Sequence, residues 1–185
     1  MPKEFHFALT DNEKAVLHDL ARRVISERAQ GHNIGSPGAA PTKLLGEQLG
    51  AFVTLKKEGR LRGCIGRIIS DMPIWQTIFD MAQEAAFHDP RFPAVADHEV
   101  SQLNIEISVL SPLTPCPDPQ LIEVGTHGLF ITKAHSRGLL LPQVPVEQNW
   151  NREQFLDHTC IKAGLAPGSW KDPATQLFWF QAEVF

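Results

Sequence analysis

The sequence predicts an α+β protein in which antiparallel strands pack with helices, followed by a smaller lobe. Three observations support this prediction: a helical pattern near the N-terminus, alternating strand patterns around a short polar turn, and a proline-rich segment before a second group of short apolar runs. The length of 185 residues suits one domain with an attached lobe. A hydrophobic content of 43% is enough for a packed core.

The first predicted element is a helix that begins at Thr10. Thr10 followed by Glu13 is typical of a capping box, in which the two side chains satisfy free backbone N–H groups at a helix start. Apolar residues then recur at helical spacing, and Gly31 marks the end. Residues 31–41 are rich in Gly and Pro, which predicts a loop.

Two antiparallel strands and a second helix come next. Residues 51–57 and 61–68 flank the polar segment 58–60, as in a hairpin. Asp71 and Pro73 predict a helix start, and the helix should end near residues 88–90, because a proline disfavours the helical conformation of the residue before it. Residues 103–109 alternate apolar and polar side chains, which predicts a half-buried strand.

The proline-rich region 112–119 predicts a connector, and we place a possible lobe boundary around residues 111–120 of a single domain, 1–185. After it we expect short strands at three apolar runs, a helix, and an aromatic-rich terminal strand. Their residues are 121–124, 129–132 and 139–141 for the strands, 150–163 for the helix with Gly164 as its left-handed cap, and 177–185 for the last strand.

Composition excludes several classes of protein. The net charge is −4 and no run of Lys and Arg exceeds two residues, which argues against nucleic-acid binding. The three cysteines are odd in number and far apart, so neither a disulfide framework nor a closed zinc site is expected. Residues 1–6 lack the apolar core of a signal peptide and no long apolar stretch occurs, so we expect a cytoplasmic protein.

Cys64 is the best candidate nucleophile. Strand parity places Arg62 on its face, about 6–7 Å away, where a guanidinium would favour the thiolate. Gly63 and Gly66 leave out side chains where a ligand or another backbone could approach. The alternative is that Cys64 is a small core residue, because free cysteine is among the most buried residue types.

His127 and Glu106 are the candidate proton carriers. His127 lies in the glycine-flanked loop 125–128, where an imidazole would be exposed and could act as a general base; the alternative is a turn histidine with a backbone partner. Glu106 lies on the polar side of its strand, and is an acid or base only if that face lines a cleft rather than facing solvent. Asp89 and Arg91 flank Pro90, and either pair with each other or cap the helix end.

No motif calls for a cofactor or metal ion. The histidines form no HExxH or i, i+4 pair, and the nucleotide-binding and serine hydrolase signatures are absent from the sequence.

Taken together, several segments resemble the AMMECR domain family, whose microbial members include protein A of the AmmeMemoRadiSam set. LRGCIG at residues 61–66 is the most specific of these segments. The others are GAFVTL (50–55), AAFHDPRF (85–92), IEISVL (105–110), Gly128-Leu129, LLPQV (140–144) and CIKAGL (160–165) with Trp170.

The resemblance implies a mixed, largely antiparallel sheet with flanking helices, in a larger part plus a smaller lobe, with Cys64 lining a cleft. The resemblance favours the interpretation of Cys64, His127 and Glu106 as catalytic residues over the structural alternatives. The residues that we expect to bind a small-molecule substrate are Arg62, Gly63, Gly66, Asp89, Arg91 and Gln143.

The resemblance also implies a link to a Memo-type protein and a radical S-adenosylmethionine enzyme. Three functions therefore stay open: a cysteine-dependent enzyme of unknown reaction class, a non-catalytic binding or scaffold partner of those two proteins, and, less favoured by the acidic composition, a nucleic-acid-associated regulator. The chain would be a monomer or a homodimer.

Overall fold

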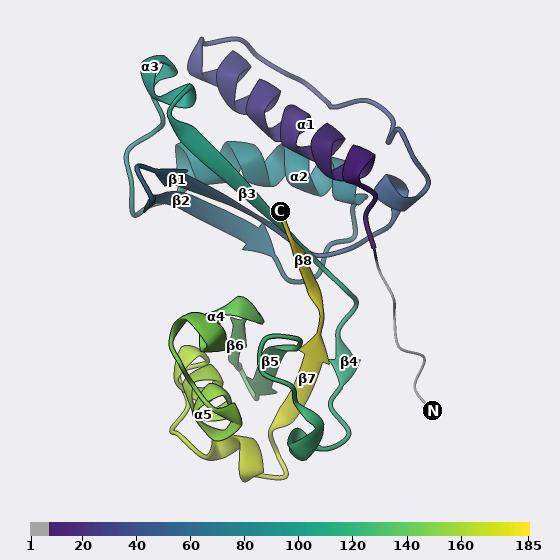
Figure 1. Cartoon of the computed structure of the whole chain (residues 1–185), viewed down its shortest axis with the longest axis vertical. Coiled ribbons are helices and arrows are strands. Elements are labelled where there is room, and N and C mark those ends of the chain that lie inside the picture. Colours follow the sequence, from purple (N-terminus) through teal and green to yellow (C-terminus); the bar gives the residue numbers. More distant parts are fainter. Residues whose placement is uncertain (1–7) are drawn as a thin grey trace. The chain divides into compact units, whose positions relative to one another are not determined.

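A computed structural model of the chain describes residues 8–185, which form two compact units (Figure 1). The first unit contains residues 8–110 and 183–185, and the second contains residues 111–182. Both are α+β, as the sequence predicts, but each has its own four-stranded sheet. The expectation that no signal peptide is present concerns residues 1–6, which lie outside the described residues.

The sheet of the first unit has the strand order β2-β1-β3-β8. The predicted hairpin is confirmed: β1 (Ala51–Lys57) and β2 (Arg60–Arg67) pair antiparallel, and β1 also pairs antiparallel with β3 (Leu103–Leu110). The hairpin turn has positive φ at Glu58 (52°) and Gly59 (73°), which suits the twist of the flanking strands.

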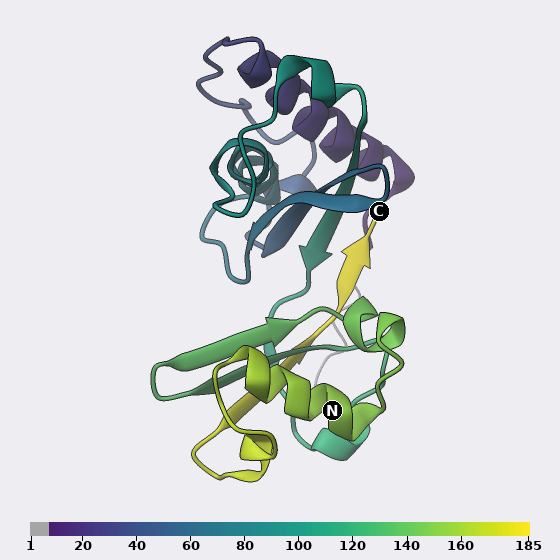
Figure 2. The same ribbon diagram turned by 90° about the vertical axis from the view of Figure 1, so that its left-hand side faces the viewer.

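Two helices cover one face of this sheet (Figures 1 and 2). Helix α1 (Asp11–Ala29) begins with the predicted capping box at Thr10, and α2 (Ile74–Gln83) packs against β1. Alternate β1 residues, among them Val53 and Leu55, are buried beneath the helices, while those between them are half-exposed. The first sheet therefore has a helix-covered face and an opposite face, which we call the open face.

The shorter elements of the first unit lie in its connections. They are η1 (Leu44–Gly46), the π-helix η2 (Glu84–His88) and α3 (Asp97–Val100). The second helix ends near residue 88 as predicted, but its last turn is a π-helix, a wider turn that is frequent at functional sites.

The sheet of the second unit has the order β4-β7-β5-β6. Its strands are β4 (Thr114–Pro115), β5 (Gly128–Lys133), β6 (Ser136–Leu140) and β7 (Gln176–Phe180). Helix α5 (Arg152–Lys162) packs against β5 and β6 and is followed by Gly164 at φ 75°, the predicted left-handed cap. The other helices are α4 (Gln143–Glu147), η3 (Pro119–Leu121) and η4 (Ser169–Lys171).

Two predicted strands differ from the structure. Residues 121–124 are not a strand, because the Asp118 side chain accepts the N–H of Gln120 and starts η3 instead. The terminal segment forms two strands, since β7 belongs to the second sheet and β8 (Ala182–Val184) to the first. Gln181 is the residue that connects β7 to β8. Its N–H donates to the Ser111 Oγ, and its C=O accepts from the Ser111 N–H.

Within residues 8–185, no helix has both the length and the apolar content that crossing a membrane would require.

Candidate functional site

Cys64 lies on β2, an edge strand of the first sheet, with its side chain half-buried. Its partner on β1 is Thr54, and the Cys64 Sγ lies 3.2 Å from the Thr54 Oγ1, within hydrogen-bond range for sulfur. Thr54 is half-exposed between the buried residues Val53 and Leu55, so both side chains belong to the open face. The thiol therefore has a hydroxyl partner that can donate a hydrogen bond to it.

The peptide groups of Cys64 are held by two side chains rather than by another strand. Its N–H donates to Asp89 Oδ2 at 2.9 Å, and its C=O accepts from Arg91 Nη2 at 3.0 Å. An edge strand leaves such backbone groups without a ladder partner, so Asp89 and Arg91 replace the missing strand at this one residue. The main chain that carries the thiol is thereby fixed on both sides.

Asp89 is the centre of this arrangement. Its side chain is 2% exposed and accepts from Arg91 Nε at 2.9 Å, Nη2 at 2.6 Å and the Arg91 backbone N–H at 3.1 Å. The guanidinium of Arg91, followed by the N–H of Cys64, holds the pKa of the Asp89 carboxyl far below its usual range, although burial opposes this. Both carboxylate oxygens therefore accept hydrogen bonds from groups of the protein.

Arg91 differs from Asp89 in its exposure. Its side chain is 53% exposed. The hydrogen bonds that its guanidinium makes within residues 8–185 use Nε and Nη2 but not Nη1. A half-exposed guanidinium bonded to the carbonyl of Cys64 is well placed to meet an anionic group that approaches the thiol.

Glu106 extends the row of polar side chains on the open face. Thr54 lies opposite both Cys64 on β2 and Glu106 on β3, so the three residues form one line across three strands. Glu106 Oε2 accepts from Lys56 Nζ at 2.9 Å, and the two side chains are about one third exposed. Neighbours directly opposite on one face have Cβ atoms about 4.5–5.5 Å apart, which brings Glu106 near Thr54.

Arg62 is held away from this line by a β-bulge. Leu55 pairs with Gly63 and Lys56 with Leu61, so Arg62 is the extra residue and simple strand alternation does not continue through it.

The guanidinium of Arg62 binds Glu99 instead, at 2.9 Å from Nη2 to Oε2, together with the carbonyl of Pro93. Arg62 and then Lys57 hold the pKa of Glu99 at about 2. The guanidinium that is bonded to Cys64 is that of Arg91.

Gly63 and Gly66 of the LRGCIG segment lie where other parts of the protein approach the backbone of β2 closely. A Cβ on Gly63 would lie 2.1 Å from the carbonyl oxygen of Ala85, and a Cβ on Gly66 would lie 2.2 Å from the ring of Phe52. Real Cβ atoms do not approach other atoms so closely. Gly63 thus allows η2 to pack directly on β2.

His127 and Gln143 lie in the second unit. The Nδ1 of His127 accepts the backbone N–H of Glu123 at 3.0 Å, and its ring stacks on Trp179 with centroids 4.5 Å apart. A neutral ring with Nδ1 as acceptor carries its proton on Nε2. The Oε1 of Gln143 is buried and has no hydrogen-bond partner among residues 8–185.

The other two thiols differ from Cys64. Cys160 is buried, Cys116 is half-buried, and burial raises the pKa of each. Residues 8–185 also contain no group of three or more His, Cys, Asp or Glu side chains arranged to hold a metal ion.

Sequence reasoning missed Thr54 and Lys56. Counting outward from the turn at 58–59 would place residue 54 opposite residue 63, and the bulge at Arg62 shifts the partner to Cys64. The signal that could have found Thr54 is therefore the hairpin register, read with one extra residue on β2.

Comparison with known proteins identifies the family. The AMMECR1 family model matches residues 18–185. The chain belongs to the AMMECR1 family. A relative from Methanothermobacter thermautotrophicus is 41% identical over 184 residues, which cover 96% of this chain and 95% of that protein. A relative from Thermococcus gammatolerans is 40% identical over 189 residues, which cover 97% of this chain and 92% of that protein.

A solved structure agrees with the AMMECR1 fold. The crystal structure of the uncharacterized protein PH0010 from Pyrococcus horikoshii matches with a TM-score of 0.87 and 40% identity, covering 96% of this chain and 93% of that one. This AMMECR1 chain therefore has the α+β fold of a solved relative over nearly its whole length.

Proposed function

We propose that this AMMECR1 protein is a small-molecule enzyme in which Cys64 is the nucleophile. The observation that carries the proposal is the fixed position of the thiol: its peptide is bound by Asp89 and Arg91, and its sulfur lies 3.2 Å from the hydroxyl of Thr54. A reactive group held by locked neighbours is what nucleophilic catalysis requires. Such a thiol also suits the reducing cytoplasm in which we place the protein.

The neighbours of Cys64 suggest roles in this chemistry. The sulfur would form a bond to a carbonyl carbon of the substrate, so that the π electron pair of the C=O bond moves to its oxygen, while the thiol proton passes to Glu106, the predicted proton carrier on the same sheet. The Thr54 hydroxyl would donate a hydrogen bond to the anionic sulfur. Arg91 would bind an anionic group of the substrate, and Asp89 would act as a positioning residue.

The Thr54 contact provides a test with a matched control. Thr54→Val removes the hydroxyl and keeps the branched shape, whereas Thr54→Ser keeps the hydroxyl. A hydrogen bond to a charged group contributes about 1.5–3 kcal/mol, so Thr54→Val should slow iodoacetamide alkylation of Cys64 at pH 7 roughly tenfold or more. Thr54→Ser should stay within about twofold of the natural protein.

The readout is peptide mapping by mass spectrometry, in which a peptide without cysteine serves as the internal reference for the amount of protein. Equal alkylation of Cys64 in both Thr54 variants would mean that the hydroxyl does not support the thiolate, and would remove the main support for the proposal.

An alternative is that the protein is a non-catalytic partner of the Memo-type and radical S-adenosylmethionine enzymes. The observation that favours it is the exposed apolar segment between β2 and α2, where Ile69 is 72% and Met72 is 39% exposed. Co-purification from the native host should then survive Cys64→Ala and be lost in Ile69→Asp. Retention of the same partners by Ile69→Asp would count against this surface.

A further inference from the structure

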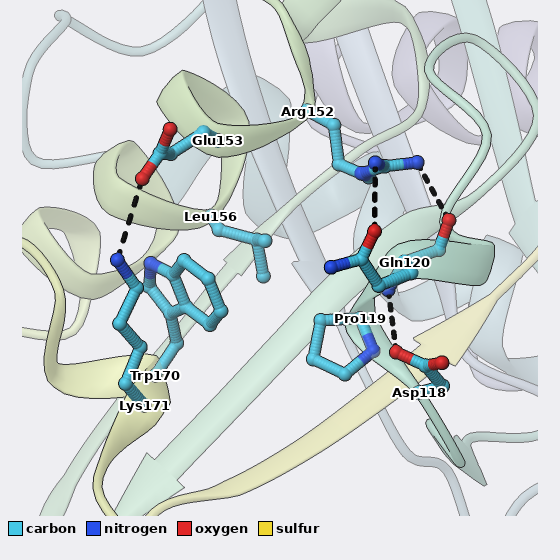
Figure 3. Close-up of a pocket in the computed structure, with 8 residues that line it drawn as sticks. All are labelled: Asp118, Pro119, Gln120, Arg152, Glu153, Leu156, Trp170 and Lys171. Atoms are coloured by element: carbon cyan, nitrogen blue, oxygen red, sulfur yellow. Dashed lines mark hydrogen bonds and ion pairs between the residues drawn. The ribbon is translucent and has the colours of Figure 1, made fainter.

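The second unit contains a cavity of about 350 Å³ that does not include any of the predicted site residues (Figure 3). Its volume is within the range of roughly 300–1,000 Å³ that is usual for small-molecule sites. Residues from η3, α5 and η4 line it: Asp118, Pro119, Gln120, Arg152, Glu153, Leu156, Trp170 and Lys171.

One side of the cavity is apolar and fixed. Leu156 is 2% exposed, and Trp170 packs against the same small cluster. The indole N–H of Trp170 donates to Asp157 Oδ1 at 2.8 Å, which sets the orientation of the ring. In Figure 3, Leu156 and Trp170 lie across the cavity from Pro119 and Gln120. An apolar group of a ligand would therefore meet a preformed surface.

Two of the four charged residues at the cavity neutralise each other. Lys171 Nζ lies 3.3 Å from Glu153 Oε1 and 4.7 Å from the centroid of the Trp170 ring. This pair adds no net charge to the rim.

The other two charges have no opposite charge as a partner within the described chain. Arg152 donates to the carbonyl oxygen of Gln120 at 2.6 Å and to its Oε1 at 3.5 Å, and both acceptors are neutral. Asp118 Oδ1 accepts the Gln120 N–H at 2.8 Å, and that donor is also neutral. The cavity thus has one uncompensated cation and one uncompensated anion, on opposite sides of Gln120 (Figure 3).

We propose that this cavity binds a small zwitterion with an apolar body, of the α-amino acid class. The ligand carboxylate would bind the guanidinium of Arg152, the ammonium would bind the carboxylate of Asp118, and the side chain would lie against Leu156 and Trp170. A ligand with both charges is favoured because either charge alone would leave one rim group without a partner. The cavity is separate from the Cys64 site, which lies in the first unit.

The test is isothermal titration calorimetry of the full chain with three probes. L-Phenylalanine carries both charges, N-acetyl-L-phenylalanine lacks the ammonium, and L-phenylalaninamide lacks the carboxylate. L-Phenylalanine should bind saturably, and each derivative should bind at least about tenfold more weakly, since a charged hydrogen bond contributes about 1.5–3 kcal/mol.

Substitutions of Asp118 and Arg152 test which residue binds each charged group of the ligand. Asp118→Asn keeps the oxygen that caps η3, and Arg152→Gln removes the guanidinium. Each should weaken L-phenylalanine at least about tenfold, and Asp118→Asn should leave the already weak binding of the N-acetyl derivative unchanged. The controls Glu147→Gln and Arg137→Gln change exposed charges outside the cavity and should stay within about twofold.

Absence of saturable binding of L-phenylalanine to the natural chain would overturn the proposal. Equal binding by Asp118→Asn, Arg152→Gln and their controls would overturn it as well. The three probes give an answer on the natural protein even if a variant fails to fold.

Discussion

Asp89→Asn should destabilise the first unit by an amount that follows from the contacts of the carboxylate. Asn keeps one acceptor oxygen, so it can retain the two bonds at Oδ1 but loses those at Oδ2, which come from the Cys64 N–H and Arg91 Nη2. A hydrogen bond to a charged group contributes about 1.5–3 kcal/mol, but Arg91 is half-exposed and its guanidinium can return to water.

These terms give a loss of about 2–4 kcal/mol in the free energy of unfolding. For a chain of this size, each kcal/mol lowers the melting temperature by roughly 2–4 °C, so the midpoint should fall by roughly 4–16 °C.

The pH dependence of this loss of stability is a second, independent test. The pKa of Asp89 is lower in the folded state than in the unfolded chain, because Arg91 and the Cys64 N–H stabilise the ionised form. The stability that it contributes is therefore fully present above the unfolded value of about 4, and is lost as the pH falls through the folded value. The difference between the natural protein and Asp89→Asn should be constant between about pH 5 and pH 8 and should shrink below about pH 4.

The assay is scanning calorimetry at pH 7, 5 and 3.5, with Asp71→Asn as the control. Asp71 is exposed, and its side chain makes none of the contacts that Asp89 makes. The control should melt like the natural protein. If Asp89→Asn melts like Asp71→Asn, or if its deficit grows on acidification, the charged contact between Asp89 and Cys64 does not stabilise the fold.

Two further predictions concern packing and burial. Gly63→Ala should lower the free energy of unfolding by about 1–3 kcal/mol, because the new methyl would meet the rigid backbone oxygen of Ala85, whereas Gly46→Ala, measured by urea unfolding in parallel, has room for the methyl. A stability equal to that of Gly46→Ala would show that η2 does not pack so closely on β2. Gln143→Met should raise the free energy of unfolding by about 1 kcal/mol by removing a buried acceptor without a partner in the described chain, while the exposed Gln148→Met should change little. A loss of stability in Gln143→Met would mean that Oε1 has a partner that stabilises the fold.

The parts of the fold that sequence predicted are those with local causes. The capping box at Thr10, the hairpin turn at 58–59, the alternation along β3 and the cap at Gly164 each depend on residues within a few positions of one another. The error at the C-terminal strand arose where distant contacts decide the outcome. Residues 177–185 have a continuous strand pattern, but pairing with two different sheets divides them at Gln181.

The candidate site shows the same limit. Cys64 is recognisable from its motif and from the resemblance to the family. Its contacts are not recognisable, because Asp89 reaches it from 25 positions away through the π-helix η2, and Thr54 reaches it through a bulged register. Strand parity suggested Arg62 as the cation near Cys64. In the structure, Arg91 donates a hydrogen bond to the Cys64 carbonyl, and Arg62 donates to the Glu99 carboxylate.

The reactivity of Cys64 towards iodoacetamide, followed from pH 6 to pH 10 with all three thiols mapped in one sample, tests the central claim most directly. Burial raises the pKa of Cys116 and Cys160, so both should react only at high pH. We predict that Cys64 reacts readily well below pH 8 and before either of the others. A Cys64 that stays inert across this range, or that reacts only together with Cys116, would contradict its role as a nucleophile.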